Sequence, residues 1–133
     1  MSTVFCDTSA LYALVQPTDE FHEKAATAWQ LLVERHKLLT SNYIIVETIA
    51  ICQTRVGLKA ATSVLERIEG VVDIGWIDPA LHDAALQELL TSNRRQLSFM
   101  DCTSFAFMRR HRIDTVFTFD PHFTQHGFKL FQA

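Results

Sequence analysis

Four acidic residues stand where a carboxylate could carry chemistry: Asp7, Glu47, Asp101 and Asp120. Asp7 directly follows the apolar run Val-Phe-Cys, and Asp120 directly follows Val-Phe-Thr-Phe. Both runs are typical of short buried strands. Ligands of open parallel sheets bind at the carboxyl ends of the strands, so we expect these two aspartates to share one edge of a sheet.

Glu47 lies within a strongly apolar segment, 43–52, that is predicted to be a helix. Its neighbours one turn away are largely apolar: Tyr43, Ile44, Ala50 and Ile51. A carboxylate on such a face must be neutralised, find a partner or bind metal, because desolvating a lone charge costs several kcal/mol. The alternative is a narrow exposed stripe that Glu47 shares with Thr48 and Thr54.

Each of the other three acids also has an ordinary structural explanation. Asp7 could cap the helix that follows it. Asp101 comes three residues after Ser98, which resembles a capping box. Asp120 precedes Pro121, a pair common in turns. Capping and site chemistry are compatible, since a side chain at a helix start also lies near the strand ends.

A cluster of these four acids would require a cation. Two unit charges about 4 Å apart repel by several kcal/mol at an effective dielectric near 20, so the cluster must be protonated or metal-bound. Hard oxygen ligands select Mg²⁺ or Mn²⁺. Zinc is not indicated, because Cys6, Cys52 and Cys102 form no CxxC pair and fit buried thiols in a reducing compartment. Such a metal site could activate water and stabilise charge on a phosphate.

Short apolar runs alternate with longer helical patterns, which predicts an α/β domain with a parallel sheet. Expected strands cover 4–6, 38–40, 71–77, 115–119 and 128–131. Expected helices begin at 7–9 and cover 19–35, 43–54, 58–69, 79–90 and 98–110. A length of 133 residues fits one domain, 1–133.

The composition is globular, with 48% apolar and 20% charged residues. The net charge of −3 argues against a purely electrostatic nucleic-acid binder, although not against an enzyme whose acidic site is neutralised by metal. The N-terminus lacks the features of a signal peptide, and no apolar run approaches the roughly 20 residues that span a bilayer. We therefore expect a soluble, cytoplasmic protein without a membrane anchor.

Taken in order, four segments resemble the PIN-domain ribonucleases, especially VapC-type toxins of toxin–antitoxin pairs. They are residues 4–11, 41–47, 97–102 and 118–123, followed by Gly127. The resemblance implies a three-layer α/β/α fold with a central parallel sheet of four to five strands. It also implies Mg²⁺- or Mn²⁺-dependent cleavage of single-stranded RNA, with Asp7, Glu47, Asp101 and Asp120 as catalytic and metal-binding residues.

The resemblance also bears on Ser9, Thr118 and His122, whereas Arg109 and Arg110 are proposed from their charge. Ser9 and Thr118 fall on hydroxyl positions that often line the family's site. His122 stands where the family varies and is interpreted as a surface turn residue. RNA contact needs positive charge near the acids, and Arg109 and Arg110 are candidates, although cations also suit a helix end. The expected mechanism is metal-assisted in-line attack of water, with Glu47 as a ligand or as the group that orients the water.

The resemblance further implies a cognate antitoxin partner and a homodimer, for which the helix at 19–35 could supply an interface. Two other readings stay open. The chain could act mainly as a partner-binding protein, with an antitoxin helix in a groove and a basic residue in the acidic pocket. It could instead be another magnesium-dependent phosphoryl-transfer domain such as a phosphatase. Those enzymes usually have a second aspartate two residues after the first, where this chain has Ser9.

Overall fold

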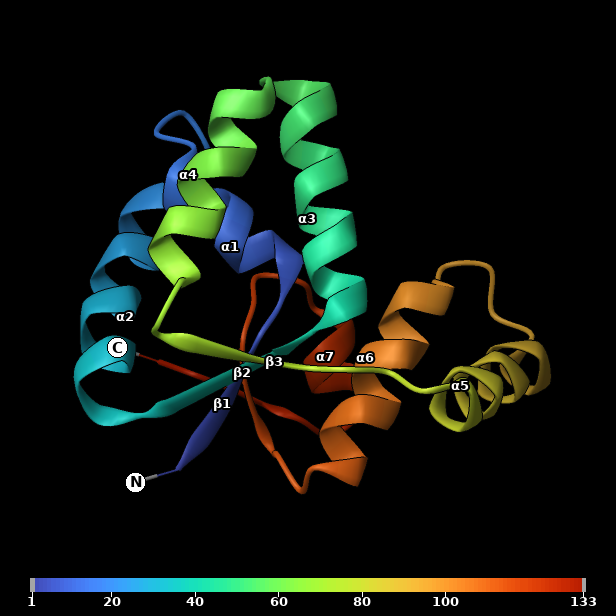
Figure 1. Ribbon diagram of the computed structural model, residues 1–133. Helices are drawn as coiled ribbons and strands as arrows, with labels where there is room; N and C mark the ends of the chain where they lie inside the picture. Colours follow the sequence, from blue (N-terminus) through green and yellow to red (C-terminus); the bar gives the residue numbers. More distant parts are fainter. Residues whose placement is uncertain (1, 133) are drawn as a thin grey trace.

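The computed structural model describes residues 2–132 and contains one sheet of five parallel strands (Figure 1). The strand order is β3-β2-β1-β4-β5, and every neighbouring pair is parallel. The strands are β1 (Thr3–Cys6), β2 (Lys37–Ser41), β3 (Val72–Gly75), β4 (Thr115–Phe117) and β5 (Lys129–Leu130). The first strand therefore lies at the centre, with the strand that precedes Asp120 directly beside it.

The described helices are α1 (Thr8–Val15), α2 (His22–Arg35), α3 (Asn42–Arg55), α4 (Leu58–Ile68), α5 (Pro79–Ser92), α6 (Phe99–Arg110) and α7 (His122–Gln125). Figure 1 shows α1, α2 and α4 gathered on one side of the sheet and α6 on the other, with α5 packed on the outer side of α6. This arrangement confirms the predicted three-layer α/β/α fold.

Both faces of the central strands are buried because large apolar side chains alternate along them. Phe5 of β1 packs against Phe107 of α6, with ring centroids 5.5 Å apart. Phe117 of β4 faces the opposite layer and contacts Trp29 of α2 at 6.2 Å. The apolar runs at 4–6 and 115–117 therefore hold the two layers together and fix the strand tips that follow them.

Three strands are shorter than the sequence predicts: β5 covers two of the four residues expected at 128–131, and in β3 and β4 side chains take over backbone hydrogen bonds at the strand ends. The strand expected at 115–119 ends at Phe117. Beyond it, the amide of Phe119 donates to Ser9 Oγ at 2.9 Å, and that of Asp120 donates to Thr118 Oγ1 at 3.0 Å. The strand expected at 71–77 likewise ends at Gly75, and the amide of Ile77 donates to the Asn42 side chain at 2.8 Å.

Polar caps fix the starts of the helices that border the strand tips. Ser41 Oγ accepts a hydrogen bond from the amide of Ile44 at 3.1 Å, so α3 begins where β2 ends. Ser98 caps α6 in the predicted capping box. Over residues 2–132, none of the helices has both the length and the apolar character needed to cross a membrane.

Candidate active site

All four predicted acids line one pocket of about 440 Å³ at the carboxyl ends of the central strands. They reach it from four separate elements. Asp7 follows β1, Glu47 lies on α3, Asp101 lies on α6, and Asp120 follows β4. The expectation that distant parts of the chain bring these carboxylates to one edge of the sheet is met.

Asp7 is the most deeply buried of the four, with 7% of its surface exposed. Its Oδ2 atom accepts hydrogen bonds from Thr118 Oγ1 at 2.7 Å and from Ser9 Oγ at 2.9 Å. The two hydroxyls lie 3.0 Å from each other. Ser9 lines the acidic pocket, and the hydroxyls of Ser9 and Thr118 join the tips of β1 and β4 around the Asp7 carboxylate.

Burial raises the pKa of Asp7 from its ordinary value of 3.8 to about 6. The hydrogen bonds from Thr118 and Ser9 lower this pKa, whereas the charges of Glu47 and Asp120 raise it. Asp7 also caps α1 through a 3.4 Å contact from the amide of Ser9. Asp7 therefore caps α1 and lines the acidic pocket at the same time.

Glu47 and Asp101 show the same pattern. Burial raises the pKa of each, and the charge of Asp120 raises both further. The Asp101 charge also raises the pKa of Glu47, while a hydrogen bond with Thr8 lowers it. The alternative of an exposed stripe at Glu47 is wrong, because Thr48 is fully buried and donates to Thr8 Oγ1 at 3.1 Å. The charge of Asp120 therefore raises the pKa of each of the other three acids, in addition to the larger effect of burial.

Asp101 takes part in the capping box at the start of α6. The amide of Asp101 donates a hydrogen bond to Ser98 Oγ at 2.9 Å, and the amide of Ser98 donates one to Asp101 Oδ2 at 3.4 Å. The second contact is long for a hydrogen bond, so the carboxylate is only weakly engaged by the cap. Its position in the first turn still aims it at the strand tips.

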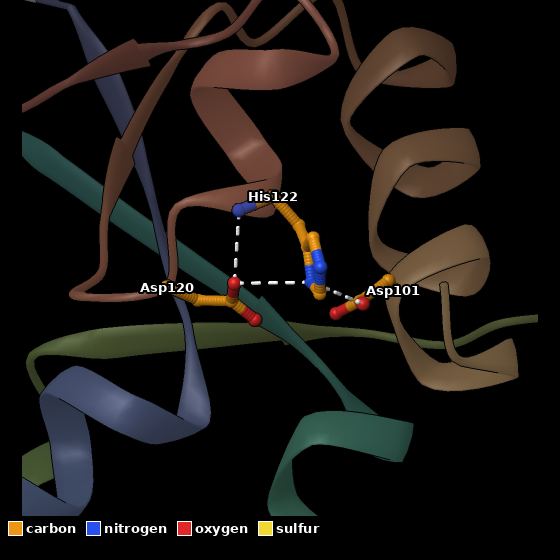
Figure 2. Close-up of side chains that lie close together, drawn as sticks. All are labelled: Asp101, Asp120 and His122. Carbon is orange, nitrogen blue, oxygen red and sulfur yellow. Dashed lines mark hydrogen bonds and ion pairs between the residues drawn. The ribbon is translucent and has the colours of Figure 1, made fainter. Parts of the chain in front are cut away.

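His122 is the residue that sequence reasoning placed wrongly. Figure 2 shows its ring between Asp120 and Asp101, with Nδ1 3.2 Å from Asp120 Oδ1 and 3.1 Å from Asp101 Oδ2. This nitrogen is buried and has hydrogen-bonding geometry to neither oxygen. The sequence suggested a surface turn, but residues 122–125 form the short helix α7, whose first residue turns inward. The amide of His122 donates to Asp120 Oδ1 at 2.9 Å, which ties the two residues together.

The donor set fits a divalent cation. Ligand atoms of Asp101, Asp120 and His122 lie within 4.8 Å of one another, and the carboxylates of Asp7 and Glu47 line the same pocket. The site is rich in carboxylate oxygen, and no cysteine thiol lines it. Mg²⁺ and Mn²⁺ prefer such donors. Burial and, to a lesser extent, neighbouring acidic charges raise the pKa of Asp7, Glu47 and Asp101, and a nearby positive charge would favour their ionised forms.

Arg109 and Arg110 lie away from these acids. Arg109 pairs with Glu88 at 3.2 Å and Arg110 pairs with Asp78 at 3.1 Å, so both bind to α5 and its cap. Neither lines the acidic pocket. The expectation that they put positive charge beside the site is not met, because nearer carboxylates hold them on the outer surface. Their part in substrate binding stays a prediction.

Comparison with known proteins places the chain in a family. The PIN domain model matches residues 4–129. The chain belongs to the PIN-domain family. Within it, a Mycobacterium tuberculosis protein described as the 23S rRNA-specific endonuclease VapC20 is 32% identical over 126 residues, covering 94% of this chain and 95% of that protein. The chain is therefore a member of the PIN-domain family that is similar to VapC-type proteins.

Solved structures agree with this placement. The crystal structure of M. tuberculosis VapC20, described as a Sarcin-Ricin loop cleaving toxin, matches with a TM-score of 0.89, 30% identity, and 98% of this chain and 99% of that chain covered. The crystal structure of VapBC2 from Rickettsia felis, bound to a DNA fragment from its promoter, matches with a TM-score of 0.72 and 12% identity, and the match covers 98% of each chain. The structure of FitAcB from Neisseria gonorrhoeae matches with a TM-score of 0.65 and 17% identity, and the match covers 99% of this chain and 97% of that chain. The last two show the fold alone.

Proposed function

We propose that this PIN-domain protein is an endoribonuclease that cleaves single-stranded RNA with Mg²⁺ or Mn²⁺ in the pocket formed by its four acids. One observation carries the proposal. Carboxylates from four separate elements line one pocket, and burial together with neighbouring acidic charges raises the pKa of Asp7, Glu47 and Asp101. Such a cluster is unfavourable for the fold without a cation and useful for phosphodiester hydrolysis with one.

In this proposal Asp7, Asp101, Asp120 and Glu47 hold the metal, directly or through water. A bound divalent cation supplies a more acidic water and charge for the phosphate oxygens. Ser9 and Thr118 hold the Asp7 carboxylate in place through their hydroxyl groups. Glu47 orients the attacking water, and its raised pKa makes it a better proton acceptor than an ordinary glutamate.

We propose a loop of ribosomal RNA as the first substrate to test, because the relative VapC20 is described as specific for 23S rRNA. An enzyme with this substrate would work in the cytoplasm. We also propose that a cognate antitoxin inhibits the protein by laying an apolar helix on it and placing a basic side chain among the acids. A homodimer, with α2 as one candidate interface, belongs to the same proposal.

Cleavage of an RNA oligonucleotide that carries the ribosomal loop tests the proposal. We expect cleavage with Mg²⁺ or Mn²⁺, none in EDTA, and at least about a hundredfold loss in Asp120→Asn, because losing one charged group of this kind costs about 3 kcal/mol of transition-state stabilisation. Asp83→Asn, an exposed aspartate of α5 outside the pocket, is the matched control and should cleave normally. Undiminished cleavage both in EDTA and by Asp120→Asn would overturn the proposal.

A further inference from the structure

The acidic pocket continues past the four carboxylates along one face of α3. Glu47, Ile51 and Arg55 all line it, and their spacing of four residues places them on the same side of the helix. Eight residues of α-helix rise about 12 Å. The backbone position of Arg55 is therefore about 12 Å along α3 from that of Glu47, in the last turn of the helix.

Arg55 is the single lysine or arginine among the residues that line this pocket. Six carboxylates share the pocket with it: Asp7, Asp19, Glu20, Glu47, Asp101 and Asp120. Within residues 2–132, Arg55 nevertheless forms no ion pair with any of them. Its charge is available to a ligand, unlike the charges of Arg109 and Arg110.

Tyr12 explains where the guanidinium is held. The Arg55 Cζ atom lies over the Tyr12 ring at 5.5 Å from its centroid, a distance within the range of a cation–π contact. Tyr12 follows Thr8 by one turn of α1 and lines the same pocket. The ring stabilises the arginine at the end of the pocket, and Arg55 remains exposed to solvent there.

We infer that Arg55 binds a backbone phosphate of the RNA strand, one that neighbours the phosphate held at the acids. The inference rests on the proposed ribonuclease function and extends it to the path of the strand. A polyanion entering among six carboxylates needs a cation beyond the metal, and a guanidinium matches phosphate geometry through paired hydrogen bonds. The displacement along α3 separates Arg55 from the scissile phosphate, so Arg55 is a substrate-binding residue.

Salt-dependent RNA binding tests this inference. Single-stranded RNA is titrated by fluorescence anisotropy at several salt concentrations in the Asp120→Asn background, which prevents turnover under the proposed function. Arg55→Ala is compared with Arg67→Ala, because Arg67 is an exposed arginine in the last turn of the neighbouring helix α4 and lies outside the pocket. Cleavage is measured in parallel with Asp120 intact.

Arg55→Ala should weaken RNA binding about tenfold and reduce the slope of log K against log salt by about 0.7, the value for one phosphate contact on a single strand. KM should rise with little change in kcat. Arg55→Lys should keep the slope and lose part of the affinity, and Tyr12→Leu should weaken binding less than Arg55→Ala. Arg67→Ala should match its parent.

Equal affinity and equal salt slope in Arg55→Ala and Arg67→Ala, with cleavage by the parent intact, would overturn this inference alone. A chain with Asp120 intact that neither binds nor cleaves RNA would overturn the proposed function and this inference together.

Discussion

Asp7 is deeply buried, and without a bound metal its ionised carboxylate destabilises the fold. Its pKa of about 6 lies above the ordinary 3.8, so the folded state keeps a proton between these two pH values that the unfolded chain has released. Folding stability therefore falls as pH rises from about 4 to about 6 and levels off above that range. A difference of about two pH units corresponds to about 3 kcal/mol.

We expect Asp7→Asn to remove the loss of folding stability that Asp7 causes between about pH 4 and pH 6. In EDTA at pH 8 the variant should exceed the wild type in free energy of unfolding by up to about 3 kcal/mol, because an amide accepts the same hydroxyl hydrogen bonds without a buried charge. Denaturant titrations at pH 4 to 8 measure the effect. Asp83→Asn is the control and should follow the wild type. Parallel curves for wild type and Asp7→Asn across this range would contradict the account.

Thr118 opposes the burial effect on Asp7, because its hydroxyl donates to the carboxylate at 2.7 Å and lowers the pKa. Thr118→Val keeps the shape and removes the donor, so the pKa of Asp7 should rise further. The acidic limb of the kcat/KM profile should then move to higher pH, with activity lost mostly below pH 7. Thr118→Ser should restore the profile. An unchanged acidic limb in Thr118→Val would show that this hydroxyl does not tune the site.

At the scale of elements, strand and helix types follow from hydrophobic pattern, whereas their ends depend on contacts across the chain. The helix start at Ser98 was predictable because both members of its capping box lie within three residues. The end of β4 could not be predicted in this way. The amide of Phe119, which would otherwise extend the strand, donates a hydrogen bond to Ser9, a residue more than a hundred positions away in the sequence. The short helix α7 was missed because four residues carry no periodic pattern.

Gly75, at the end of β3, shows a close approach that no local pattern signals. A Cβ atom there would lie 2.6 Å from Phe107 Cζ, and Phe107 is fully buried against Phe5 and His111. Gly75→Ala should therefore lower the free energy of unfolding by about 1–3 kcal/mol through overpacking.

A double-mutant cycle with Phe107→Leu checks the cause. The smaller side chain makes room, so Gly75→Ala should cost less in that background than in the wild type. Chemical denaturation of the four proteins gives the coupling. If Gly75→Ala were as stable as the wild type, the close contact would not constrain this strand end.

At the scale of the whole molecule, the four acids could be predicted because each sits at a recognisable place in its own element. The rest of the pocket could not. His122 enters it through the irregular start of α7, and Arg55 enters it because α3 passes over α1. Arg109 and Arg110 looked suitable in sequence, but acids of α5 and its cap lie closer to them in space. Which cation faces which acid depends on tertiary packing.

The central claim is that carboxylates from the whole length of the chain hold one divalent centre. Anomalous diffraction from a crystal of this protein soaked in Mn²⁺ tests it most directly. We predict one or two manganese peaks within about 2.2 Å of carboxylate oxygens from at least two of the acids Asp7, Glu47, Asp101 and Asp120. A fully soaked crystal with no manganese among these acids, or with manganese bound only elsewhere on the surface, would contradict the account.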